Sequence, residues 1–116
     1  MGDNVNTSTK EDVFVDSFPE LLNSIRTNSP KARVVCVGIW FNHATVKSIM
    51  IENCAKYGCE FVDISALNTA ANQAVEGATV TYRDGTTGTI AAAWATHPGD
   101  NGMMAIGDMV IDALNM

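Results

Sequence analysis

The sequence has little charge, and little of it is positive. Charged side chains make up 17% of the 116 residues, and seven Lys and Arg stand against 13 Asp and Glu, so the formal net charge is −6. Nucleic acids and anionic membranes are bound by basic surfaces that meet phosphate. The charge balance therefore argues against both kinds of partner.

Long apolar runs and a leader-like beginning are also missing. No apolar run approaches the roughly 20 residues that span a bilayer, so we expect no membrane span. The first twelve residues, MGDNVNTSTKED, have neither a basic start nor an apolar stretch, and therefore do not form a secretory signal in the chain as given. Hydrophobic residues make up 47% of the chain, which suffices for one domain over residues 1–116.

Cysteine is scarce, with three residues in all. Cys54 and Cys59 are separated by four residues, and no second cysteine pair or nearby histidine completes a zinc site. We expect no metal, no cofactor, and thiols that pack as small hydrophobic groups. A cysteine nucleophile is the weaker alternative, because nothing marks Cys36, Cys54 or Cys59 as an activated thiolate.

Two unbroken apolar segments predict a parallel sheet. RVVCVGIWF at 33–41 and CEFVDIS at 59–65 are β-prone without alternation, which is typical of strands covered on both faces. Between them a helix is expected from an Asn42 cap to about Tyr57, with Gly58 as its left-handed terminator. The three elements make one right-handed βαβ unit. An earlier helix, over about 12–28, is expected to start or bend near Pro19.

The second half of the chain has weaker signals before its last helix. Residues 66–75 suggest a short helical piece, and Asp84-Gly85 between β-prone flanks predicts a hairpin or an irregular excursion. His97 precedes a proline and is therefore expected on a loop. Asp100 is expected to cap a final helix, whose buried stripe would consist of Met103, Ile106, Met109, Val110, Ala113 and Leu114.

Two predicted parallel strands are too few for a stable sheet. We therefore expect the missing strands to come from another copy, in a homo-oligomer, or from an N-terminal segment that completes a larger doubly wound domain. Either addition would cover an unpaired sheet edge and an apolar face.

Three stretches together resemble one family. HPGDNGMMAIGDMV at 97–110 resembles the C-terminal block of the SGNH, or GDSL-type, hydrolases, in which His-Pro precedes the last helix. The segment from 33 to 65 looks like the strand, helix and strand before that block, and GDNV at 2–5 is similar to the family's third block, Gly-x-Asn-Asp. Their order and spacing carry the resemblance, which extends from Gly2 to about Leu114.

The resemblance implies a three-layer α/β/α, flavodoxin-like fold with a parallel sheet, incomplete in this chain. It implies an esterase that acts on acyl or acetyl esters, such as small-molecule or carbohydrate esters. It also implies that His97 is the catalytic base and that Gly2 and Asn4 bind the oxyanion. Trp94 stands where the family usually has the Asp that orients the imidazole, and Val5 replaces the Asp of the third block.

The family's nucleophile block is absent from these residues. No Gly-Asp-Ser occurs, and Asp16-Ser17 lacks the glycine and lies in a helical context. We therefore expect the serine on a segment missing from this chain, and reduced activity is an open outcome because Trp94 offers no carboxylate. A non-catalytic binding or assembly module is the alternative, and an unrelated flavodoxin-like domain is disfavoured because no Gly-rich phosphate loop follows a strand.

Each candidate residue also has a plain structural interpretation. His97 could be a loop histidine that hydrogen-bonds a backbone carbonyl, or could use such a carbonyl to fix its tautomer in a Ser-His dyad. Asn4 could be a turn residue near a fraying end. His43, beside the expected Asn42 cap, is expected to be a solvated first-turn residue.

Overall fold

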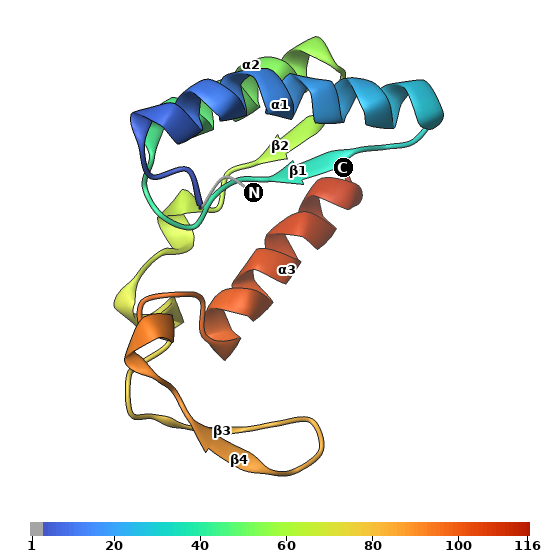
Figure 1. Cartoon of the computed structure of the whole chain (residues 1–116). Helices are drawn as coiled ribbons and strands as arrows, with labels where there is room; N and C mark the ends of the chain where they lie inside the picture. Colours follow the sequence, from blue (N-terminus) through green and yellow to red (C-terminus); the bar gives the residue numbers. More distant parts are fainter. Residues whose placement is uncertain (1–3) are drawn as a thin grey trace.

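A computed structural model describes residues 4–116 of the protein. It is a mixed α/β structure with two separate two-stranded sheets (Figure 1). In chain order the helices and strands are α1 (Ser8–Asn28), β1 (Val35–Val37), α2 (Ala44–Lys56), β2 (Glu60–Val62), β3 (Thr79–Thr81), β4 (Thr87–Thr89) and α3 (Asp100–Leu114). Three 3₁₀ turns lie between them, at Ser65–Leu67 (η2), Ala70–Asn72 (η3) and Ala92–Trp94 (η4).

The predicted parallel strands are confirmed. β1 and β2 lie side by side in parallel, with Val35 opposite Glu60 and Val37 opposite Val62. Each is only three residues long, shorter than the apolar segments that predicted them. Helices α1 and α2 cover one face of this pair and α3 lies against the other (Figure 1). Coverage on both faces explains why the two segments are apolar without alternation.

The larger core lies between α1, α2 and the sheet. Its buried members are Val5, Phe14, Phe18, Leu22, Ile39, Val46, Ile49, Met50 and Cys54. Cys36 and Phe61 pack against this core from the two strands. The thiols thus occupy apolar positions as expected, and burial raises the pKa of Cys54 to about 12, which makes its thiolate form inaccessible near neutral pH.

The smaller core lies on the α3 side of the sheet. Trp40, Val62 and Ile64 are buried there, and α3 contributes Ile106, Met109 and Ala113. The expected buried stripe of this helix is therefore only partly right. Met103 is 58% exposed and Leu114 is 47% exposed, because the two-stranded sheet is narrow and α3 turns one face only toward it.

Both predicted helix starts in the first half are wrong. α1 begins at Ser8, four residues earlier than expected, because the Thr7 hydroxyl caps it by accepting from the Lys10 N–H (3.2 Å). The helix continues through Pro19 to Asn28. Burial of Phe14 and Leu22 on either side of Pro19 outweighs the hydrogen bond that proline cannot donate.

The cap of α2 is His43, not Asn42. The imidazole Nδ1 accepts from the Val46 N–H at 3.4 Å, and Nε2 lies 3.1 Å from a carboxylate oxygen of Glu11 in α1. His43 is therefore a structural residue that joins two helix starts, and not a solvated one. The other end of α2 is as predicted, because Gly58 has a φ of 64° and terminates the helix.

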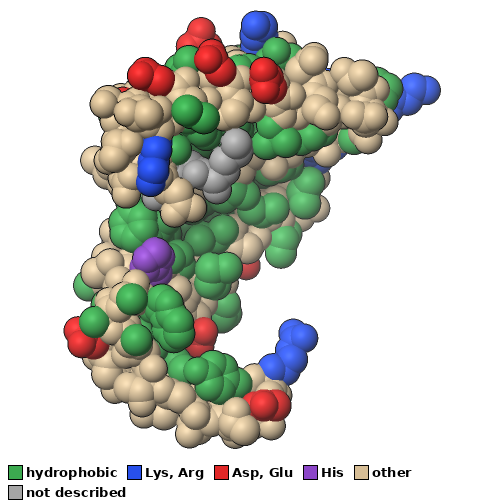
Figure 2. Space-filling view, in the orientation of Figure 1, with side chains coloured by type: hydrophobic (Ala, Val, Ile, Leu, Met, Phe, Trp, Pro, Cys, Tyr) green, Lys and Arg blue, Asp and Glu red, His purple; other side chains and the backbone are tan. Residues whose placement is uncertain are grey.

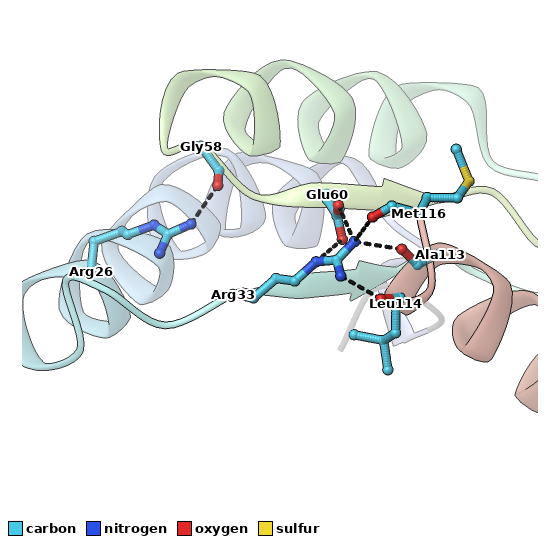
Figure 3. Close-up of polar contacts among 7 residues, drawn as sticks. All are labelled: Arg26, Arg33, Gly58, Glu60, Ala113, Leu114 and Met116. Atoms are coloured by element: carbon cyan, nitrogen blue, oxygen red, sulfur yellow. Dashed lines mark hydrogen bonds and ion pairs between the residues drawn. The ribbon is translucent and has the colours of Figure 1, made fainter.

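Two arginines tie the ends of these elements together (Figure 3). Arg33 forms an ion pair with Glu60 (2.7 Å) and donates to the carbonyls of Ala113 and Leu114 (2.5 Å each), which anchors the C-terminus of α3 to both strands. A cation at this position also complements the helix dipole. Arg26 donates to the Gly58 carbonyl at the end of α2.

We expect Leu22→Ala to lower the free energy of unfolding by about 2–5 kcal/mol, because the side chain is 1% exposed and its removal leaves a cavity. Leu21→Ala is the matched control on the same helix, since Leu21 is 43% exposed. Urea unfolding of both variants measures the difference. Equal losses would contradict the assignment of the core face of α1.

Candidate functional site

The loop that carries His97 is docked at the carboxyl end of β1. The indole Nε1–H of Trp40, three residues after β1, donates to the Thr96 carbonyl at 2.8 Å. The next residue, Phe41, meets the His97 imidazole edge-on, with ring centroids 5.1 Å apart and an interplanar angle of 89°. His97 therefore lies where open α/β sheets usually bind ligands.

Backbone hydrogen bonds hold this loop against the segment after η3. Ala74 and His97 are joined by an N–H···O bond of 2.7 Å, and the Thr96 N–H returns to the Ala74 carbonyl at 3.0 Å. Thr96 has a φ of 69°, a left-handed conformation that a β-branched residue rarely adopts. These bonds and the Trp40 indole fix the conformation, which turns the chain sharply just before His97.

His97 lines an open pocket of about 510 Å³. The wall is mostly apolar, and the other lining residues are Gln73, Ala74, Val75, Ala78, Val80, Ile90, Trp94, Pro98, Gly99 and Asp100. The polar residues of the lining are Gln73, His97 and Asp100. An imidazole and a carboxylate in an apolar pocket form a reasonable binding site for a small molecule.

The imidazole of His97 is exposed and is not oriented by a hydrogen bond from any described residue. Trp94 lines the same pocket and is 61% exposed. It contributes a carbonyl that accepts the His97 backbone N–H at 3.3 Å, and this bond does not involve the ring. Within residues 4–116, no backbone carbonyl accepts a hydrogen bond from the His97 imidazole. The carbonyl expected in a Ser-His dyad is therefore absent from these residues, and so is the carbonyl expected for a plain loop histidine. The imidazole instead contacts the Phe41 ring at nearly a right angle.

Asn4 lies in a different pocket. It is exposed and lines a hollow of about 320 Å³ at the start of α1, together with Val5, Thr9, Lys10, Val13, Phe14 and Ser17. This hollow shares no lining residue with the His97 pocket. Gly2, the other expected oxyanion-binding residue, lies outside the described residues. The structure thus does not bring Asn4 and His97 together.

Two further expectations concern residues near these pockets. Asp100 is not the cap of α3 but its first residue, and the capping position is held by Gly99 without a side-chain hydrogen bond. A carboxylate in the first turn still interacts favourably with the helix dipole. Ser17 is within α1, where its hydroxyl donates to the Val13 carbonyl at 2.8 Å, so its predicted helical context is confirmed.

Sequence reasoning missed a polar cluster just after β2. The Lys47 ammonium lies 2.5 Å from one carboxylate oxygen of Asp63, and the Ser65 hydroxyl donates to the other at 2.7 Å. The Lys47 contact comes first among the causes that lower the pKa of Asp63 to about 2. Asp and Ser two residues apart were the available signal, since this spacing forms a side-chain turn.

Comparison with known protein families, curated proteins and solved structures finds no match to the chain. Within residues 4–116, no helix is long and apolar enough to cross a membrane. The same residues contain no group of three or more His, Cys, Asp and Glu side chains arranged to hold a metal ion. The interpretation of the site therefore depends on its own geometry.

We expect Gly102→Ala to destabilise the docking of α3 beside the site. A Cβ there would collide with the Asn72 carbonyl and lie 3.3 Å from the Trp40 ring. Gly107→Ala on the same helix is the control, because no atom lies within 4 Å of its added Cβ, and it should stabilise by up to about 1 kcal/mol. Thermal unfolding of both variants tests the contrast, and a gain in stability for Gly102→Ala would contradict it.

Asp63 also predicts how stability responds to acid. The pKa of Asp63 in the folded protein, about 2, lies below the ordinary value of 3.8. The contribution of Asp63 to the free energy of unfolding is therefore complete above pH 3.8 and is lost as the pH falls toward 2. Asp63→Asn should therefore lose less unfolding free energy than the wild type over that window. Asp16→Asn, at an exposed position of α1, is the control. Identical acid curves for the wild type and Asp63→Asn would refute the role of the Lys47 contact.

Proposed function

We propose that His97 is the general base of an SGNH-type ester hydrolase whose nucleophilic serine comes from outside these 116 residues. The observation that carries the proposal is the exposed His97 imidazole, which lines a mostly apolar pocket and contacts Phe41 just beyond the carboxyl end of β1. Open α/β sheets bind their ligands outside the carboxyl ends of the strands. The position also agrees with the resemblance of residues 97–110 to the block that carries the family's base.

Among the described residues β2 is the strand that pairs with β1, and the other edge of β1 suggests where the serine would enter. Val34 and Gly38 bond to β2, through the Glu60 N–H (2.9 Å) and the Val62 carbonyl (2.8 Å). Alternate residues of a parallel strand serve the same neighbour, so Val35 and Val37 direct their backbone groups to the other side. We infer that a further parallel strand pairs there, within a wider flavodoxin-like sheet. Its carboxyl end would then lie near the His97 loop.

In this proposal His97 accepts the proton of the serine hydroxyl as its oxygen attacks the ester carbonyl. The carbonyl–alkoxy bond then breaks, the alcohol leaves with that proton, and an acyl-enzyme remains. Water, deprotonated by the same imidazole, attacks the acyl group; the bond to the serine oxygen breaks, the acid is released and the imidazolium returns its proton to the serine. Asn4 and Gly2 are the proposed oxyanion donors, and Asn4 has to leave its own pocket to act in this way.

A binding or assembly module is the second candidate. The observation that favours it is the His97 imidazole itself, which no carboxylate of residues 4–116 orients and which has Trp94 in the place of one. Loss of an orienting carboxylate costs about 10⁴ in rate in serine proteases. The apolar walls of the pocket would still bind a small molecule in the absence of catalysis.

Hydrolysis of 4-nitrophenyl acetate separates the two candidates. The chain alone should show no turnover, whereas the chain preceded by a strand and turn that carry Gly-Asp-Ser should show turnover. In the restored protein His97→Ala should lower the rate by at least about 10². His43→Asn is the matched control, because asparagine retains a side-chain acceptor for the start of α2, and it should retain the rate.

A His97→Ala variant with the rate of the restored wild type would remove His97 from the mechanism and favour the binding module. Turnover by the chain alone, with a trapped acyl group on one of its own residues, would contradict the external serine.

A further inference from the structure

The hairpin formed by β3 and β4 projects from the body as an arm (Figure 1). We define the arm as residues 78–90. Its register pairs Thr79 with Thr89, Val80 with Gly88 and Thr81 with Thr87. One face therefore carries four threonines. The other face carries Ala78, Val80, Tyr82 and Ile90, and we call it the apolar face of the arm.

Tyr82 is the largest side chain on this apolar face. Its ring lies across Gly88, where an added Cβ would lie 2.8 Å from a ring carbon. Even so, the residue is 50% exposed. An isolated two-stranded hairpin is marginal in water and is usually stabilised by a helix that packs on it. The apolar face of the arm thus lacks the helix that it needs.

Helix α3 carries a second apolar stripe away from the sheet. Its members recur at helical spacing and are Met103, Met104, Gly107, Val110, Ile111 and Leu114. Met104 is 68% exposed and Ile111 is 55% exposed. A stripe with this spacing is one that helices normally bury. Figure 2 shows a hollow between the body and the arm, and neither surface covers the other within one chain.

The charges beside these two surfaces are complementary. Arg83, at the end of the arm, is the only Lys or Arg after Lys56. α3 has Asp100, Asp108 and Asp112 and no Lys or Arg. By helical spacing, Asp108 and Asp112 border the second apolar stripe. An arginine that reaches the middle of this helix would therefore meet carboxylates, since Arg33 lies at its C-terminal end.

We propose that a second copy of this chain supplies the missing cover. The apolar face of each arm packs on the second apolar stripe of the other copy's α3, with Arg83 beside Asp108 and Asp112. The arm of the first copy contacts α3 of the second, and the arm of the second copy contacts α3 of the first, so the assembly closes as a twofold dimer. Ala78, Val80 and Ile90 of the apolar face also line the His97 pocket, so in the dimer the other copy's α3 borders that pocket. The inference does not depend on the proposed esterase activity.

Sedimentation of the full chain over a wide concentration range tests the proposal. The wild type should dimerise, and Tyr82→Ser or Met104→Ser should raise the dimer dissociation constant at least about tenfold, as loss of a central apolar contact does. Thr81→Ser, on the opposite face of the arm, is the control and should leave the constant unchanged. Circular dichroism verifies that each variant is folded.

A charge exchange identifies the partner surface. Arg83→Glu should weaken the dimer, and the same change combined with Asp108→Arg and Asp112→Arg should restore it. A wild-type chain that stays monomeric at all concentrations would overturn the proposal. A dimer that is unaffected by Tyr82→Ser and by Arg83→Glu would also overturn it, because its interface would lie elsewhere.

Discussion

The fold depends on Trp40, which joins four parts of the chain at the carboxyl end of β1. The residue is 3% exposed, its indole donates to the Thr96 carbonyl (2.8 Å) and its own carbonyl accepts from the Asn68 amide (3.1 Å). The ring also approaches Gly102 at the start of α3. Two three-residue strands bury little by themselves, and Trp40 connects the sheet to the segments that follow it.

The position of His97 follows from that contact. Once the Thr96 carbonyl is held by Trp40, the left-handed turn at Thr96 brings His97 against the Phe41 ring. The imidazole then lies beyond the carboxyl end of β1, the end of the strands at which α/β folds bind ligands. Among residues 4–116, no strand pairs with the outer edge of β1, and this is why the proposed function requires a strand from elsewhere.

Much of this fold was predictable from the sequence, and the site was less so. The unbroken runs around Cys36 and Phe61 predicted the parallel pair, and Gly58 marked the end of α2, because these signals are local. The cap by His43 was not predictable, since it depends on Glu11 in another helix. The exposed stripe of α3 was also missed, because periodicity shows that a helix has an apolar face and does not show how wide its neighbour is.

The site was predictable only as a loop position. Pro98 placed His97 outside a helix. The contact of the His97 imidazole with Phe41 joins residues 56 positions apart, and no local sequence pattern encodes such a contact.

Hydrogen exchange of the two indole N–H groups tests the account most directly, because each tryptophan gives its own NMR signal. We expect the Trp40 signal to exchange slowly and the Trp94 signal, from a side chain that is 61% exposed, to exchange rapidly. Equal, rapid exchange of both would contradict the docking of the His97 loop on β1.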